Sequence, residues 1–198
     1  MSGVFLPFTP NGKATELRAI EVKSRLGLTA SAPVDPIAVL TRVPARLIDS
    51  RWLQSASPDL AHALFVEHAS SWSGIGLGES PHDGAFLILL NPTHALTRQR
   101  ATAMEEIVHI VLKHPKSELS LRFDITPVRA RSYDANVETE AYSVGAACLL
   151  PYPDLFHAIR DRSESLEALA HRFGVSQAYV EFRIKTAGLM RMYRSRCA

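Results

Sequence analysis

The sequence has few of the features that mark exported, membrane-spanning or zinc-finger proteins. It contains only two cysteines, Cys148 and Cys197, and no Cys-x-x-Cys pair. This argues against a structural zinc finger and favours reduced thiols in the cytosol. No run of about 18 apolar residues occurs, and the N-terminus lacks a basic segment followed by an apolar one. We therefore expect a cytoplasmic protein that neither enters a membrane nor carries an export signal.

Other absences argue against several classes of fold and activity. The sequence has no internal repeat, no low-complexity segment and no glycine-rich phosphate loop, and neither cysteine has the context of a catalytic nucleophile. Its 198 residues are 46% hydrophobic and 21% charged. This balance is typical of a globular protein with one core and room for a small second unit, and it excludes a disordered chain.

The centre of the sequence predicts an amphipathic helix over residues 104–114. Apolar residues cover most of its surface, so we expect it in the core. Glu105 and His109 are four residues apart and share one face, and Glu106 lies one position further round. In the zinc-peptidase motif His-Glu-x-x-His, two imidazoles at this spacing hold the metal and the glutamate activates water. Here a carboxylate replaces the first imidazole. Alternatively, the three residues form an ordinary, partly solvated helix face.

Residues 138–151 predict a second helix, made mostly of small and apolar residues. Its acidic residues, Glu138 and Glu140, lie at the N-terminal end. The helix dipole favours negative charge there, so a favourable helix start would by itself explain both acids. The functional interpretation of these acids depends on the pairing of the two helices.

Taken together, the two helices resemble the ImmA/IrrE family of metallo-endopeptidases. In that family a strand ending near Asn-Pro and an Arg-rich approach lead into His-Glu-x-x-His, and a second helix follows with the pattern Glu-x-Glu-Ala-(Asn/Asp)-x-x-Ala-Ala-x-Leu-Leu-x-Pro. Residues 85–92 and 97–100 and the two helices match this order and spacing. The resemblance covers about residues 33–190. It departs at Glu105, which replaces the first metal histidine, and at Tyr142, which replaces Asn or Asp.

The resemblance implies an α+β, zincin-like fold, in which a small mixed sheet packs on two central helices. It also implies roles for single residues. Glu106 stands at the position of the catalytic base, His109 at that of the second metal ligand and Glu138 at that of the third, with Glu140 as the alternative third ligand. Glu105 would complete the site. Because one imidazole and two carboxylates form a harder donor set than two imidazoles, we expect Zn²⁺ or Mn²⁺, or a site that has lost its metal.

Further elements are predicted around these helices. An arm over residues 1–13 precedes a helix over 15–26, and Asp35 with Pro36 indicates another helix start. Short strands are expected at residues 46–50, 72–78, 85–90 and 119–125, a polar loop at 127–136, and either a helix or a turn with a strand at 58–67. His82 and His94 are potential metal ligands by chemistry, but lone histidines in turns are usually solvated.

The sequence changes character after residue 150. We divide it into a metallopeptidase-like domain, 1–150, and a small helical extension, 151–198. Short helices are expected at residues 154–159, 163–173 and 176–186. The last two flank a Gly-Val-Ser turn in a helix-turn-helix layout. From residue 160 onward the sequence contains eight Lys or Arg and four Asp or Glu. This excess of positive charge suits a nucleic-acid contact. We favour a packing role, because a similar turn follows the peptidase core in the resembling family.

Two functions stay open at this point. The resemblance implies a metal-dependent endopeptidase that cleaves a specific protein partner, such as a helix-turn-helix repressor, with Glu106 taking the proton from the attacking water. The alternative is a degenerate, non-catalytic family member that regulates by binding a protein or DNA. Glu105 motivates this alternative, because clustered carboxylates around one imidazole repel one another without a cation.

Overall fold

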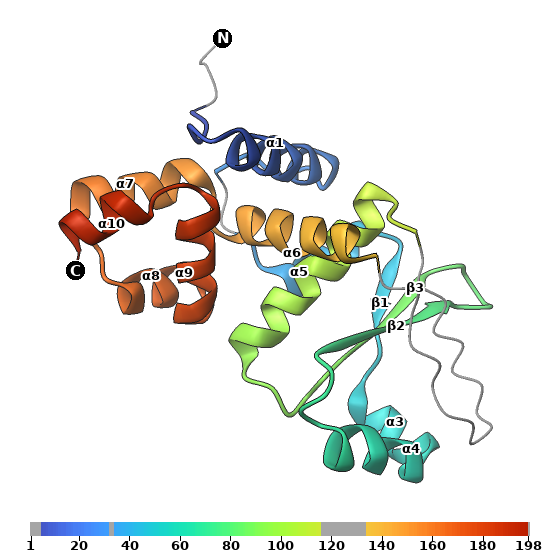
Figure 1. Ribbon diagram of the computed structural model, residues 1–198. Coiled ribbons are helices and arrows are strands. Elements are labelled where there is room, and N and C mark those ends of the chain that lie inside the picture. Colours follow the sequence, from blue (N-terminus) through green and yellow to red (C-terminus); the bar gives the residue numbers. More distant parts are fainter. Residues whose placement is uncertain (1–4, 32–33, 116–133, 198) are drawn as a thin grey trace. The chain divides into compact units, whose positions relative to one another are not determined.

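The structure is a computed structural model that describes residues 5–31, 34–115 and 134–197 (Figure 1). The chain divides into two compact units. The sheet unit is Pro36–Glu138, and the helical unit combines Met1–Asp35 with Thr139–Ala198. Among the described helices, none is long and apolar enough to cross a membrane. The domain boundary predicted at residue 150 stays a prediction.

The described part of the sheet unit contains a three-stranded mixed sheet with strand order β1-β3-β2. β1 (Ala45–Leu47) pairs in parallel with β3 (Phe86–Leu90), and β2 (Gly74–Glu79) pairs with β3 in the antiparallel direction. The register shifts between Gly76 and Glu79, which marks an irregularity in β2. The antiparallel pair is the hairpin that the two strand-like segments and the intervening turn residues predict.

One face of the sheet packs on short helices. Leu89 of β3 belongs to a buried apolar cluster with residues from α3 (Ser50–Ala56), α4 (Pro58–His62) and the π-helical turn η2 (Ala63–Glu67). Residues 58–67, which the sequence left open between helix and strand, are therefore helical. Because side chains alternate along a strand, Ile88 points to the opposite face.

That opposite face is covered by α5 (Leu96–Leu112), which contacts both β2 and β3. The helix also contacts α2 (Pro36–Val39), which begins at the proline that the sequence marked and continues into the 3-10 turn η1 (Leu40–Arg42). α5 starts at Leu96, earlier than the predicted start at residue 104. The arginine-rich segment 97–100, expected before the helix, forms its first turns.

A buried asparagine fixes the segment that leads from β3 into α5. The side-chain amide of Asn91 donates to the carbonyls of Ala69 (2.7 Å) and Trp72 (3.0 Å). Its oxygen accepts from the backbone N–H (3.0 Å) and the hydroxyl (2.7 Å) of Thr93. Asn91 is fully buried, and these bonds satisfy its polar atoms. The start of α5 is thereby held against the β2 side of the sheet unit.

In the helical unit, α1 (Pro10–Arg25) begins earlier than predicted. The hydroxyl oxygen of Thr9 accepts from the N–H of Gly12 (3.2 Å), and Pro10 occupies the first turn. Pro10 and Gly12 do not break the helix there. The first N–H groups of a helix have no intrahelical partners, so proline loses no hydrogen bond at this position, and its φ is already helical. The prediction of an irregular arm over 1–13 was therefore wrong from residue 10 onward.

The rest of the helical unit consists of further helices. They are α6 (Ala135–Leu149, in this unit from Thr139), α7 (Tyr152–Arg162), α8 (Leu166–Phe173), α9 (Gln177–Thr186) and α10 (Met190–Arg196). Gly174, in the left-handed conformation (φ 64°), ends α8, and the Ser176 hydroxyl caps α9 by accepting from the N–H of Tyr179 (3.2 Å). The backbone thus has the predicted helix-turn-helix layout. α10 was not predicted, and it packs against α7 and α9.

A buried ion pair joins the first helix of this unit to the last ones. Arg183 of α9 pairs with Glu16 of α1, and the two side chains are 0% and 3% exposed. The second carboxylate oxygen of Glu16 accepts the N–H of Tyr152 (2.9 Å), and Arg183 Nε donates to the carbonyl of Leu150 (3.0 Å). The N-terminal helix is therefore an integral part of the helical unit.

The architecture confirms the predicted fold class. A small mixed sheet carries the motif helix α5 on one face, and helices dominate the rest of the described chain, as in an α+β, zincin-like domain. The strand predicted at 119–125 and most of the loop predicted at 127–136 lie outside the described residues.

Candidate metal centre

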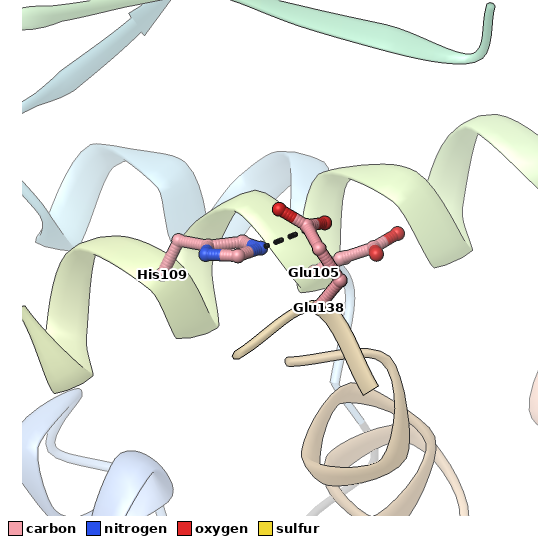
Figure 2. A group of neighbouring side chains, drawn as sticks. All are labelled: Glu105, His109 and Glu138. Carbon is pink, nitrogen blue, oxygen red and sulfur yellow. Dashed lines mark ion pairs between the residues drawn. The ribbon is translucent and has the colours of Figure 1, made fainter. Parts of the chain in front are cut away.

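Three side chains from two helices converge beside α5. Glu105 and His109 lie one turn apart on α5, and Glu138 comes from the first turn of α6; the three lie close together, with the ring of His109 directed at the carboxylate of Glu138 (Figure 2). One potential ligand atom from each lies within 4.8 Å of the other two. His109 Nε2 is 3.6 Å from Glu138 Oε2, and these side chains are 20% and 22% exposed. Among the described residues, no other group of this kind comes together.

The group lines a cavity of about 990 Å³ within the sheet unit. One face of α5 forms a wall of this cavity, from Arg98 through Glu106 to Lys113, and β2 contributes Gly74 and Gly76. Glu106 is half-buried and lies next to Glu105 along the helix. The predicted base and the three predicted ligands therefore border one space that is large enough for a peptide segment.

A glycine lets β2 approach α5 closely at this point. A Cβ built on Gly74 would lie 2.5 Å from Cγ2 of Thr102 and 3.7 Å from Oε1 of Glu106. The first distance is shorter than real Cβ contacts, so another residue would require Thr102 to shift. The Glu106 carboxylate consequently lies beside the main chain of β2. Sequence reasoning missed Gly74, although a glycine inside a strand pattern is a known sign of close backbone approach.

His114 also belongs to the site. It is the last residue of the helix predicted at 104–114, where a basic side chain complements the helix dipole, so no sequence feature assigned it to the site. In the structure its Nδ1 lies 3.1 Å from Nδ1 of His109, and the ring centroids are 5.0 Å apart at 81°. It lines the same cavity. Its position depends on how the chain leaves α5, which no residue pattern indicated.

Two other residues singled out by the sequence have partners in the helical unit. Glu140 is not a member of the converging group, and its carboxylate lies 3.5 Å from Nε of Arg18. Tyr142 packs edge-on against Phe182 (4.8 Å between centroids) and Tyr179 (5.2 Å). Tyr142, which stands where the resembling family has Asn or Asp, is thus part of an aromatic cluster.

The two turn histidines also lie outside the group. His82 is exposed in the turn between β2 and β3, where its N–H donates to the Ser80 hydroxyl (3.3 Å). His94 precedes α5, and its carbonyl accepts from the side chain of Gln99 (2.8 Å). Burial, assisted by the charge of Arg98, lowers the pKa of His94. The exposure of His82 agrees with the expectation that lone turn histidines are solvated, whereas one ring nitrogen of His94 is buried.

The donor set fits a divalent cation. Ligand atoms 2.0–2.2 Å from one zinc ion are at most about 4.4 Å apart. The three atoms, which lie within 4.8 Å of one another, therefore need only small side-chain rotations to reach coordination distance. Glu105, His109 and Glu138 would hold the ion. Two carboxylates and one imidazole are harder than a two-imidazole site, so Mn²⁺ competes better with Zn²⁺.

A mixed sheet with a helix that carries an acid–imidazole cluster, next to a further glutamate, defines a metallopeptidase-like protein. The family model described as the IrrE N-terminal-like domain matches residues 60–185, which include all four of these side chains. The chain belongs to the ImmA/IrrE family of metallopeptidases. Comparisons with curated proteins and with solved structures gave no match.

Proposed function

We propose that this protein is a metal-dependent endopeptidase in which Glu105, His109 and Glu138 hold one divalent cation and Glu106 is the general base. The proposal is carried by the convergence of three ligand atoms within 4.8 Å, bordering the same cavity as Glu106. Membership of a metallopeptidase family supports it.

The metal ligands and Glu106 have separate roles in the proposed peptide hydrolysis. A bound cation supplies the Lewis acidity that polarises the scissile carbonyl and acidifies water. Glu106 accepts a proton as the water oxygen attacks the carbonyl carbon, and it returns that proton to the amide nitrogen as the C–N bond breaks. The carboxylate is therefore regenerated, and the proton balance needs no additional acid.

The substrate is an extended segment of a protein. β2 lies at the edge of the described sheet and borders the cavity, so a bound peptide can pair with its backbone as an added strand. We propose a specific protein partner, such as a helix-turn-helix repressor, as the substrate.

DNA is the less favoured partner. A recognition helix for DNA normally presents basic residues to the phosphates and polar residues to the bases. The exposed residues of α9 are Gln177, Ala178, Glu181 and Lys185. The positive charge of Lys185 is balanced by the negative charge of Glu181, so this face attracts DNA phosphates only weakly. This supports a packing role for α8 and α9.

The metal set can be tested with a matched pair of variants. Glu138→Gln removes a ligand carboxylate, whereas Glu140→Gln changes the same residue type two positions along α6. By calorimetric titration with Mn²⁺ and Zn²⁺, we expect about one ion per chain in the parent and in Glu140→Gln. Glu138→Gln should lose more than about 100-fold in affinity, beyond the usual cost of changing a residue that only supports a ligand. A parent protein that takes up no metal under any loading condition would refute the proposal.

Glu106→Gln separates chemistry from metal binding. This variant should bind the cation with the affinity of the parent, because Glu106 is not a ligand, and it should cleave nothing. Cleavage can be detected without knowing the partner, by mass spectrometry of new protein N-termini after metal-loaded protein is added to a cell extract. New termini that appear equally with Glu106→Gln would contradict its role as the base.

A second candidate, a non-catalytic regulator, is favoured by the carboxylate at residue 105. Glu105→His restores the two-imidazole motif and distinguishes the candidates. If this substitution creates tight Zn²⁺ binding that the natural protein lacks, the site is degenerate. If the natural protein already binds its cation as tightly, degeneracy is the wrong description.

A further inference from the structure

The end of α5 has an uncommon backbone conformation. Lys113 adopts a left-handed conformation (φ 56°, ψ 42°), and only one other non-glycine residue, Ser163, has a positive φ in the described chain. Helices usually place glycine at such a position, because a Cβ is unfavourable there. The turn brings the chain back over the last helical turn. As a result, the N–H of His114 donates to the carbonyl of His109 (2.9 Å).

The same two residues also meet through their side chains. The Nδ1 atoms of His114 and His109 are 3.1 Å apart, a hydrogen-bond distance, and the rings meet edge to face at 81°. His114 therefore holds both the main chain and the imidazole of His109. The opposite nitrogen of His109, Nε2, is the atom 3.6 Å from Glu138. The imidazole is thus held at one nitrogen and directed to the carboxylates with the other.

We propose that His114 is the positioning residue of the metal ligand His109. A neutral imidazole has one ring proton, so a His109 that offers the Nε2 lone pair to a cation carries its proton on Nδ1. Nδ1 of His114 accepts that proton in a hydrogen bond, and His114 then carries its own proton on Nε2. This inference rests on the proposed function, because it needs a cation at the site.

Charge explains why a histidine, and not an acid, positions His109. Metal-ligating histidines commonly donate their second N–H to a carboxylate or a carbonyl. The cavity already contains the carboxylates of Glu105, Glu106 and Glu138. A neutral imidazole fixes the ring of His109 without adding another negative charge to this group, which would repel the existing ones.

Three substitutions separate the hydrogen bond from simple packing. His114→Phe keeps an aromatic ring over His109 but has no acceptor. His114→Asn has a shorter side chain whose carbonyl oxygen comes close to the position of Nδ1, so it keeps the acceptor and loses the ring. His114→Gln moves its amide to the position of Nε2, beyond the bond. All three retain the main-chain bond to His109, and His82→Phe, in an exposed turn, is the matched control.

The measurement is metal affinity by calorimetry with Mn²⁺ and Zn²⁺, together with the visible absorption of the Co²⁺-loaded protein, which reports ligand geometry. We expect His114→Phe and His114→Gln to lose about 10- to 100-fold in affinity. His114→Asn should stay within a few-fold of the parent, and His82→Phe should equal it. The Co²⁺ spectrum should change in the Phe and Gln variants only. Should His114→Phe fail to fold, the comparison of Asn with Gln decides.

The outcomes distinguish this inference from the proposed function. If the parent binds metal and His114→Phe or His114→Gln binds it equally well, His114 does not position the ligand and the proposed function stands. If His114→Asn loses as much affinity as His114→Phe, the ring and not the acceptor matters, and the inference is overturned. If the parent binds no metal, the proposed function fails and this inference fails with it.

Discussion

Glu16→Gln should destabilise the protein severely, although residue 16 is far in sequence from the metal centre. The Glu16 carboxylate is the counter-ion of Arg183, and both side chains are almost completely buried. Glutamine has nearly the same shape, and its oxygen can still accept the N–H of Tyr152, but its NH2 group then faces the guanidinium, so the substitution removes both the charge and the hydrogen bond from Arg183. It leaves a buried guanidinium without its carboxylate partner. Burial lowers the pKa of Arg183, and the charge of Glu16 is the first effect that opposes this.

The magnitude follows from the burial. Breaking one side of a buried ion pair typically costs about 3–5 kcal/mol, against a total stability of about 5–15 kcal/mol for a domain. Replacing both partners removes the stranded charge, so Glu16→Gln with Arg183→Met should recover most of the loss. Glu21→Gln is the matched control, since Glu21 lies on the same helix and makes only exposed pairs with Arg18 and Arg25. Exposed pairs contribute little, so we expect almost no change.

Urea denaturation followed by circular dichroism tests this prediction. With a slope of about 2 kcal/mol per molar urea, a loss of 3–5 kcal/mol lowers the midpoint by about 1.5–2.5 M. A midpoint for Glu16→Gln within about 0.3 M of the parent would refute the reasoning. A double variant no more stable than Glu16→Gln would show that the loss does not come from a stranded charge.

Other sites give briefer predictions. Burial raises the pKa of the Cys148 thiol to about 12, so maleimide should label Cys197 and leave Cys148 unlabelled until urea unfolds the protein, as mass spectrometry can show. Because an unfolded thiol has a pKa near ~8.5, the stability held by the neutral Cys148 should fall as pH rises from about 9 toward 12, which urea midpoints measured across this range would detect. Gly74→Ala should cost about 1–3 kcal/mol, and Thr102→Ser, which deletes the clashing methyl carbon, should restore the melting temperature in the double variant. Trp72→Phe removes an indole N–H bond to a backbone carbonyl (2.8 Å), and urea midpoints should show a loss of about 1 kcal/mol.

The sequence predicted the elements whose signals are local. The hairpin of β2 and β3 follows from two strand-like segments and a turn-rich spacer, and α9 follows from its Ser176 cap. The starts of α1 and α5 were misplaced, for different reasons. α5 begins after Ala95, which makes no side-chain cap bond, so nothing marked its true start. α1 begins at a proline and a glycine that resemble loop residues, and only the Thr9 cap shows them to be helical.

The residues of the metal centre also differ in whether a local sequence signal marks them. Glu105 and His109 could be paired from the sequence because helical spacing alone puts them on one face. Glu138 lies on another helix, and only the family resemblance pointed to it. His114 could not be found, because its approach to His109 depends on a left-handed Lys113 where helices normally signal such a turn with glycine. Tertiary approach and unusual backbone conformations are the parts that spacing does not encode.

The two departures from the family pattern have different consequences for the choice between enzyme and degenerate regulator. Tyr142 is accommodated by packing against the rings of Tyr179 and Phe182 in the helical unit. Glu105 instead still lies beside His109 and Glu138, and one of its carboxylate oxygens lies within 4.8 Å of an oxygen of Glu138. At that distance the two carboxylates repel by on the order of 1–3 kcal/mol once partial exposure to solvent is taken into account. A cation bound between them turns this repulsion into attraction. Metal titration of the parent protein therefore decides between the two candidates, because only a site that binds a cation offsets this repulsion.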